Sequence, residues 1–218
     1  MGRLARIVVP GVPHHVTQRG TRRMQVFFSR GDYRAYVQIL ARQAERYRLR
    51  VWAYCLMPNH VHLVAVPADQ ESLARSFGEA HRLYAIRINR RNGWQGHLWQ
   101  ERFFSCPMDN RHALEAIRYV LLNPVRAGLV ESAEEWRYSS ARAHRTGRPD
   151  PLVDPRPAAH LVSDWASFLE PGKDSPEALA LRRRTGRPLG SPAFVERLEE
   201  LTGRLLRRRR PGPRPGTN

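Results

Sequence analysis

The sequence is poor in cysteine and in long apolar runs. Its two cysteines, Cys55 and Cys106, lack the paired spacing of a metal site and are too few for a disulfide framework. The amino-terminal apolar run, residues 7–10, is too short for the hydrophobic region of a secretory signal, and no stretch approaches the ~18 apolar residues of a membrane span. These absences argue against a disulfide-linked secreted protein and a membrane protein, and they predict a cytoplasmic one.

Lysine is almost absent, and arginine takes its place. Lys173 is the only lysine among 37 basic residues, and the formal net charge is +17. Residues 1–50 hold 11 arginines against 2 acidic residues and residues 182–218 hold 11 against 3, whereas residues 51–181 are balanced at 15 each. Since guanidinium groups suit phosphate and base edges and no large apolar face accompanies them, two cationic ends favour nucleic acid over membrane as the partner.

Hydrophobic periodicity predicts alternating strands and helices in the first hundred residues. We expect strands at 14–19, 51–57, 60–66 and 98–104, and amphipathic helices from 32 to 47 and from 71 to about 88. The order strand, helix, strand, strand, helix, strand is that of the split βαβ, ferredoxin-like plan. The predicted fold is therefore α+β, with an antiparallel sheet, both helices on one face, and an added helix around residue 119.

Composition divides the rest of the chain. After residue 140 the sequence becomes rich in proline, alanine, arginine and aspartate, which indicates a domain edge. We therefore expect a first domain at 1–140 and a Pro/Arg-rich connecting segment at 141–185. An Arg-rich extension follows, with a C-terminal helix at 186–206, for which Ser191 and Pro192 supply the N-cap and first turn, and a disordered basic tail at 207–218.

Two histidines stand out on the third predicted strand. His60 and His62 are one residue apart in the run MPNHVHLV, and alternate residues of a strand project to the same face. Both imidazoles therefore point one way, while Val61 and Leu63 point into a core. Two imidazoles on one rigid face supply half of a divalent-metal site.

A tyrosine and an asparagine lie together on the predicted helix that follows. The apolar stripe of this helix is formed by Leu114, Ile117 and Leu121. Tyr119 and Asn123 lie roughly 160° away from that stripe and one turn apart, and Pro124 indicates that the helix ends near Asn123. Alone, such a pair is typical of a solvated surface, and a His-x-His strand is more often an exposed or hydrogen-bonded pair than a metal site. Their combination in a basic chain favours a functional interpretation.

These motifs resemble those of the REP-associated tyrosine transposases, members of the HUH superfamily of single-strand DNA nucleases. The resemblance is carried by Pro58-Asn59-His60-Val61-His62-Leu63, by Tyr119, and by the run from Asn123 to Val130. It extends to residues 13–20, 98–103 and 186–190, and so covers most of the chain.

The resemblance implies a metal-dependent enzyme that cuts single-stranded DNA folded into hairpins, the repetitive extragenic palindromes (REPs) of bacteria, and rejoins the ends. His60, His62 and Asn123 would bind Mg²⁺ or Mn²⁺, and Tyr119 would be the nucleophile that forms a 5′-phosphotyrosine link. Members of this branch are expected to act more often as monomers than as dimers, and to recognise a tetranucleotide at the foot of the hairpin through their amino-terminal region.

The residues expected to contact DNA are His14, His15, Gln18, Arg19, Arg22, Arg23, Arg102 and Arg126. Glutamine and arginine suit base edges and phosphates. For His14 and His15 the alternative is an ordinary strand position, and for Arg126 it is a role in tying down the turn next to Gly128.

Two other functions are compatible with the same elements. A non-catalytic nucleic-acid-binding module uses the same sheet plan, but RNA-binding domains of that plan stack bases on aromatics of a recognisable octapeptide, which this sequence lacks. A metal-dependent hydrolase would release its products without a protein adduct and would leave Tyr119 without a role.

Overall fold

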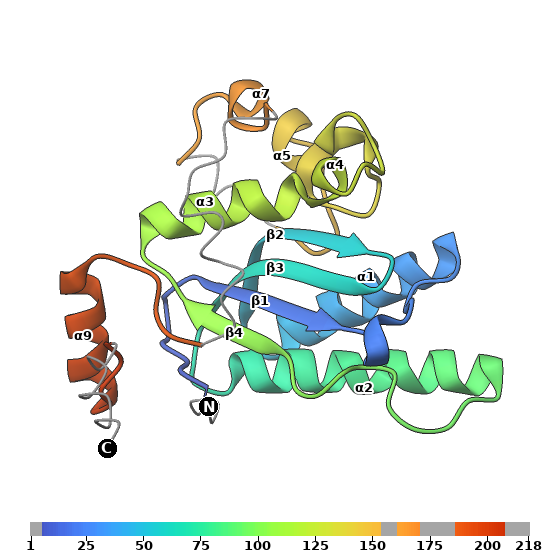
Figure 1. The fold of residues 1–218 in the computed structure, drawn as a ribbon, viewed down its shortest axis with the longest axis horizontal. Coiled ribbons are helices and arrows are strands. Elements are labelled where there is room, and N and C mark those ends of the chain that lie inside the picture. Colours follow the sequence, from blue (N-terminus) through green and yellow to red (C-terminus); the bar gives the residue numbers. More distant parts are fainter. Residues whose placement is uncertain (1–5, 154–160, 171–185, 208–218) are drawn as a thin grey trace, which may run out of the picture.

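Four antiparallel strands form the centre of the molecule (Figure 1). The computed structural model describes residues 6–153, 161–170 and 186–207. The strands are β1 (His14–Arg19), β2 (Leu49–Met57), β3 (His60–Pro67) and β4 (Phe104–Pro107). Their order in the sheet is β2-β3-β1-β4, so the first and third strands pair at the centre. This arrangement confirms the predicted ferredoxin-like α+β plan.

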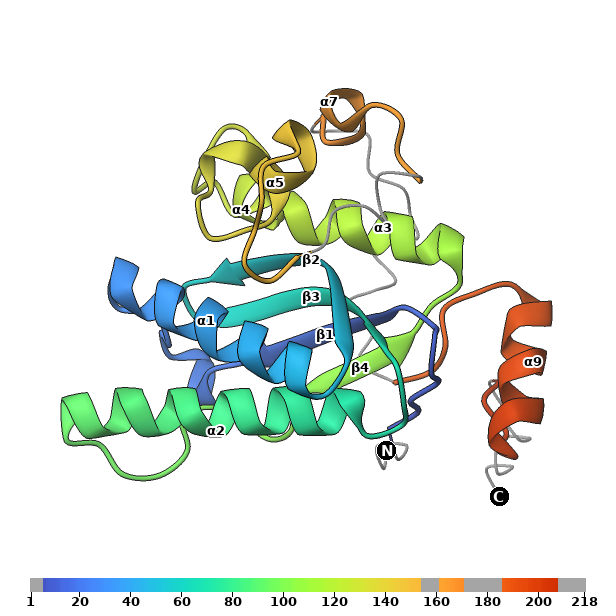
Figure 2. The same cartoon turned by 180° about the vertical axis from the view of Figure 1, so that it is seen from behind.

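Three long helices cover the two faces of the sheet. They are α1 (Arg30–Arg46), α2 (Ser72–Asn92) and α3 (Asn110–Leu121). α1 and α2 lie together on one face, and α3 lies along the other (Figures 1 and 2). Strand alternation divides the side chains accordingly: Leu63 belongs to the core under α1 and α2, and its neighbour Val64 to the core under α3.

Local sequence signals set the helix boundaries. Ser29 and Asp32 form a reciprocal capping box, so α1 begins two residues before the predicted position 32. α2 continues to Asn92 and ends at Gly93, whose φ of 65° is the left-handed conformation in which glycine commonly terminates helices. Asp109 caps α3 by accepting a hydrogen bond from the backbone of His112. The shorter elements are η1 (Thr21–Arg23), α4 (Asn123–Arg126), η2 (Ala133–Glu135), α5 (Ala141–Thr146), α7 (Trp165–Phe168) and α9 (Pro192–Thr202).

The predicted strand at 98–104 is wrong, because β4 begins only at Phe104. Residues 98–103 form a loop that is pinned to the end of β1 by backbone hydrogen bonds, including that from Gln100 to Arg19. Leu98 and Trp99 are both buried in the same core cluster, which strict strand alternation does not allow, and Glu101 has a φ of 57°. The apolar residues of this segment are buried, but its backbone before Phe104 is not a strand.

The carboxy-terminal part described by the structure packs on the amino-terminal segment. α9 begins after the predicted N-cap Ser191, which accepts a hydrogen bond from the backbone of Phe194, and it ends at Thr202, so it is shorter than residues 186–206. Leu189 lies along β4 through backbone bonds with Pro107 and Asp109. The predicted tail from residue 208 onward, and residues 154–160 and 171–185 of the connecting segment, lie outside the described residues. Within the described ranges, no helix has both the length and the apolar character needed to cross a bilayer.

Candidate active site

The sheet register brings the histidines of β1 and β3 onto one face. Thr17 lies opposite His62, and Arg19 lies opposite His60. Directly opposed residues of an antiparallel pair share a face, and His15, two residues before Thr17, shares it too. This is the face that α3 covers, so the predicted imidazole pair and the predicted tyrosine helix meet on the same side of the sheet.

A cavity of about 540 Å³ opens on this face. Its lining includes Tyr119, His60, His62 and Asn123, which are all the residues predicted to perform catalysis or to bind metal. Three arginines also line it, namely Arg19, Arg23 and Arg102. One polar, cationic cavity therefore holds a phenol, two imidazoles and an amide that come from β3, α3 and α4.

The orientation of His60 is fixed by the residue before it. The Nδ2 of Asn59 donates to the carbonyl of Arg23 at 3.0 Å, which leaves Oδ1 of Asn59 as the acceptor that faces Nδ1 of His60 at 2.6 Å. Nδ1 must therefore carry the proton, and Nε2 is the nitrogen with a lone pair. An imidazole held in this tautomer by a neighbouring acceptor is the usual state of a metal-binding histidine.

His15 contacts Nδ1 of His62, as Asn59 contacts Nδ1 of His60. Nε2 of His15 lies 3.2 Å from Nδ1 of His62, and the two rings stack with a centroid separation of 5.4 Å and an interplanar angle of 5°. His15 is 1% exposed, and burial lowers its pKa to about 4, so it is neutral at pH 7. An acceptor role for Nε2 of His15 would place the proton of His62 on Nδ1 and leave Nε2 of His62 with the lone pair, as a predicted metal ligand needs.

Tyr119 packs edge-on against this histidine pair. Its ring centroid lies 5.5 Å from that of His62 and 6.1 Å from that of His15, with interplanar angles of 86° and 90°. The guanidinium carbon of Arg126 lies 5.0 Å from the Tyr119 centroid. Tyr119 is only 9% exposed, so the alternative interpretation of this face of α3, a solvated surface, does not hold for Tyr119. The residue lines the cavity beside the two histidines with which it was predicted to act.

The turn after α3 is built around the carbonyl of Tyr119. Asn123 donates to it through Nδ2 at 3.1 Å, and Arg126 donates to it through Nη1 at 2.9 Å. Because Nδ2 is the donor, the Oδ1 of Asn123 remains the acceptor of that amide. Arg126 does not line the cavity, and its hydrogen bond supports the structural alternative, in which it ties down the turn.

The donor set of the cavity suits a hard or borderline divalent cation. Among the described residues, no cluster of three or more His, Cys, Asp or Glu side chains is arranged to hold a metal. The present set instead combines two imidazoles with the amide oxygen of Asn123, and the carboxylate of Glu101 also lines the cavity. Nitrogen and oxygen donors of this kind fit Mn²⁺, and the oxygens fit Mg²⁺.

The residues predicted to contact DNA divide into two groups. Those that line the cavity are His15, Gln18, Arg19, Arg23 and Arg102. His14, Arg22 and Arg126 are not part of the lining. His14 has no exposed surface, its Nδ1 lies 2.8 Å from the carbonyl of Val12, and burial lowers its pKa to about 4. The structure thus gives His14 an ordinary buried strand position.

Gln18 and the loop after β1 shape the rim of the cavity. The side-chain amide nitrogen of Gln18, Nε2, is engaged within the protein, because it donates to the carbonyls of Gln100 and Glu101 at 3.3 and 3.1 Å. Gln18 therefore holds the loop that carries Arg102. Arg22 and Arg23 both have positive φ, 54° and 63°, and form a tight left-handed turn that brings Arg23 to the cavity.

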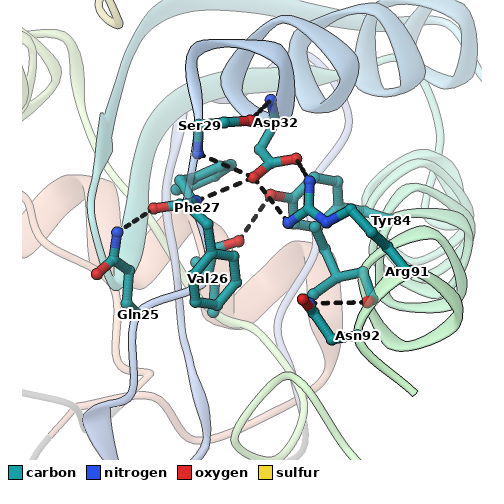
Figure 3. Close-up of polar contacts among 10 residues, drawn as sticks. Gln25, Val26, Phe27, Ser29, Asp32, Tyr84, Arg91 and Asn92 are labelled. Carbon is teal, nitrogen blue, oxygen red and sulfur yellow. Dashed lines mark hydrogen bonds and ion pairs between the residues drawn. The ribbon is translucent and has the colours of Figure 1, made fainter. Parts of the chain in front are cut away.

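A buried carboxylate stabilises the segment that follows this turn (Figure 3). Asp32 accepts hydrogen bonds from the backbone of Phe28 at 3.0 Å and from the guanidinium of Arg91, and Tyr84 donates to the carbonyl of Val26 at 2.7 Å. Burial raises the pKa of Asp32, but the bonds from Arg91 and Phe28 outweigh it and hold that pKa below its usual value. The network joins the start of α1 to the end of α2.

Sequence reasoning missed several residues of the cavity. Thr17, Gln100, Glu101 and Phe104 all line it, and Asn59 orients His60 from just outside. Thr17 carries a usable signal, because it alternates with His15 and Arg19 along β1. Gln100 and Glu101 carry none, since they reach the cavity from an irregular loop.

Comparison with known proteins places this geometry in a family. Residues 9–122 match the family described as IS200-like transposase. A REP-associated tyrosine transposase of Haemophilus influenzae is 26% identical over 107 residues, which are 44% of this chain and 61% of that protein. A REP-associated tyrosine transposase of Escherichia coli is 21% identical over 120 residues, 55% of this chain and 69% of that protein. The chain thus spans about three fifths of the first of these relatives.

A solved structure shares the fold. It is described as a REP-associated tyrosine transposase bound to a REP hairpin, and it superposes with a TM-score of 0.57 at 18% identity over 71% of this chain and 92% of that one. The family match includes His60, His62 and Tyr119 and covers more than half of the sequence. The chain therefore belongs to the IS200-like transposase family.

Proposed function

We propose that this protein is a metal-dependent single-strand DNA endonuclease and strand transferase that cleaves hairpin DNA through a 5′-phosphotyrosine intermediate. One observation carries the proposal: Tyr119, His60, His62 and Asn123 line a single cavity together with arginines. The relatives named for REP hairpins make hairpin DNA the substrate to test first.

Different residues of the cavity bind the phosphates, attack phosphorus and hold the metal ion. Arg19, Arg23 and Arg102 hold phosphates at the rim of the cavity. The oxygen of Tyr119 attacks phosphorus as its phenolic proton leaves, the bond between phosphorus and the 3′-oxygen breaks, and that oxygen takes up a proton and departs as a 3′-hydroxyl. When bound by His60, His62 and Asn123, Mg²⁺ or Mn²⁺ supplies Lewis-acid stabilisation of charge on a phosphate oxygen.

The same residues serve the rejoining reaction. A 3′-hydroxyl that attacks the phosphotyrosine reforms a phosphodiester and returns Tyr119 to its phenol form. The covalent link retains the energy of the broken bond, so joining needs no ATP. Attack by the original end reseals the strand, and attack by another end transfers it.

The direct test is a denaturing gel of the protein incubated with a single-stranded hairpin oligonucleotide and Mn²⁺ or Mg²⁺. We expect a covalent protein–DNA band that is absent for Tyr119→Phe and present for Tyr47→Phe, because Tyr47 lies at the end of α1, outside the cavity. Binding without a band would support the non-catalytic module. Cleavage without a band would support the hydrolase.

A further inference from the structure

A part of the chain beyond the family-matched segment packs on the helix that carries Tyr119. Residues 161–170, which include α7 and which we call the α7 segment, lie on the side of α3 that faces away from the sheet (Figures 1 and 2). The family match ends at residue 122, so the α7 segment lies outside it. The helix α3 is therefore held between the sheet and a segment that comes much later in the chain.

Arg118 joins α3 to the α7 segment. Its Nε donates to the carbonyl of Phe168 at 2.7 Å, and its Nη2 donates to the carbonyl of Glu170. Arg118 is 5% exposed, and a buried guanidinium is tolerated only when hydrogen bonds replace those that it made with water. The two carbonyls lie at and just after the end of α7, where backbone acceptors lack partners within the helix. Each side of the contact thus satisfies polar groups of the other.

Apolar side chains strengthen the same contact. Leu169 is buried in the core cluster that contains Tyr119, and Trp165 and Phe168 pack against that cluster. Trp165 also stacks on His144 of α5, with ring centroids 4.4 Å apart and an interplanar angle of 22°. The α7 segment is therefore fixed to both α3 and α5.

The contact acts on the residue next to Tyr119. Consecutive residues of a helix project in different directions, and here Arg118 meets the α7 segment while Tyr119 lies edge-on to His62 and His15. A shift of α3 away from the sheet would carry the phenol away from the imidazoles. Because a misplacement of about 1 Å at a reacting group can lower a rate about a hundredfold, contacts on the outer side of α3 can determine the rate of cleavage.

The start of α3 is fixed by a different contact. Asp109 accepts from the backbone of His112 through Oδ1 at 2.9 Å and from the backbone of Ser191 through Oδ2 at 2.9 Å. Tyr119 lies at the other end of α3, in its last turn. The contact between Arg118 and the α7 segment is therefore the one that holds the end of α3 that carries Tyr119.

We propose that Arg118 is a positioning residue and that the α7 segment is a clamp that holds Tyr119 in place for its attack on phosphorus. No residue of the α7 segment lines the active-site cavity, so the clamp acts through α3 and not through contact with DNA or metal. The inference rests on the proposed function, and it extends the determinants of that function to a part of the chain outside the family match.

Two pairs of variants test the clamp from its two sides. Asp164→Ala removes the carboxylate that accepts from the backbone of Ala166 and Ser167 at the start of α7, and Ser163→Ala, at the exposed position beside it, is the matched control. Since Asp164 is exposed, its replacement loosens the α7 segment without opening the core.

The second pair changes the anchor on α3. Arg118→Ala removes the hydrogen bonds to Phe168 and Glu170, and Arg118→Lys keeps a cationic donor. Arg87→Ala, at an exposed position of α2 outside the active-site cavity, is the control for the loss of an arginine.

The measurement separates positioning from folding. Single-turnover formation of the covalent adduct, at saturating hairpin DNA and Mn²⁺, gives both a rate constant and an amplitude. A loss of folded protein lowers the amplitude, whereas a misplaced Tyr119 lowers the rate constant. Dissociation constants for the hairpin and for Mn²⁺ are measured for each variant, and hydrogen exchange of the α3 amides is followed without DNA.

We expect the rate constant to fall about tenfold in Asp164→Ala and about a hundredfold in Arg118→Ala, with part of the loss recovered in Arg118→Lys and none seen in either control. The dissociation constants should stay within about twofold of those of the natural protein, because the clamp lies outside the cavity. The α3 amides should exchange faster in Asp164→Ala and Arg118→Ala.

Two kinds of failure are distinguishable. Equal rate constants in every variant, lower amplitudes alone, or unchanged exchange of the α3 amides would overturn the inference while the adduct still supports the proposed function. The absence of any adduct from the natural protein would instead refute the proposed function, and the positioning role of Arg118 with it.

Discussion

Asn59 connects the shape of a turn to the chemistry of the site. Its amide joins Arg23 to His60, so one side chain fixes both a cationic loop and the tautomer of a proposed metal ligand. From the sequence, Pro58 and Asn59 signal only a turn. The hydrogen-bonding role of Asn59 follows from the pairing of β2 with β3 and from the loop after β1, which no local pattern encodes.

Replacing Asn59 tests this role directly. Asn59→Ala removes the acceptor at Nδ1 of His60, and we expect affinity for Mn²⁺ to fall about 10-fold, as measured by calorimetry. Asn59→Asp keeps an acceptor oxygen and is expected to retain most of the affinity. Asn92→Ala, which removes an exposed asparagine at the end of α2, serves as the control. Equal affinities for Asn59→Ala and the natural protein would show that the tautomer of His60 is set otherwise.

His15 was predicted as a DNA contact or an ordinary strand position, and the structure adds a role as the neighbour of His62. As a DNA contact it would affect hairpin binding with or without metal, and as the partner of His62 it would affect mainly metal binding. We expect His15→Phe, which keeps an aromatic ring but removes the nitrogen that faces Nδ1 of His62, to weaken Mn²⁺ binding about 10- to 100-fold. Hairpin affinity measured in EDTA is expected to change much less. The reverse order of effects would restore His15 as a DNA contact.

At the scale of elements, the sequence predicted what local patterning encodes. β1 has the predicted bounds, β3 begins at the predicted His60, and α9 begins at its predicted cap. The segment at 98–104 failed because its apolar residues are buried without alternation in a loop held by Gln18 and β1. Tertiary contacts determine the backbone conformation of such a segment. The shape of the cavity wall that it forms therefore could not be predicted from the sequence.

The network around Asp32 makes a testable link between two helices. Asp32→Ala removes a cap of α1 and leaves Arg91 without this partner, so we expect the free energy of unfolding to fall by about 2–3 kcal/mol in urea titrations. Glu71→Ala breaks only the exposed pair with Arg75 and is expected to lower it by less than about 0.5 kcal/mol. Similar losses for the two variants would mean that the buried carboxylate adds nothing to an ordinary surface ion pair.

At the scale of the molecule, the proposed catalytic domain extends beyond the segment matched to the family. Asn123 lies one residue past residue 122, and Ser139 and Ser140 bond to β2, so we keep residues 1–140 as the proposed catalytic domain. The segment at 186–190 pairs with β4, and Leu198 and Leu206 pack with Ile7 and Val9. The predicted extension thus adds a backbone bridge beside the end of β4, at one edge of the sheet. That the protein acts as a monomer stays a prediction.

Buried histidines couple the stability of the whole fold to pH. Burial lowers the pKa of His14 to about 4, of His81 to about 3 and of His144 to about 4, whereas each titrates near 6.5 when unfolded. Between pH 6.5 and 4 the unfolded chain therefore binds more protons than the folded one, and stability must fall as the pH falls through this window. We expect the free energy of unfolding to fall by roughly a few kcal/mol between pH 7 and 4.5 in urea titrations.

His144→Phe preserves an aromatic ring against Trp165 and removes one titrating group, so the free energy of unfolding of this variant should depend less steeply on pH. An equally steep dependence would show that His144 does not contribute to the effect, and a flat profile for the natural protein would show that these imidazoles take up protons without unfolding the core.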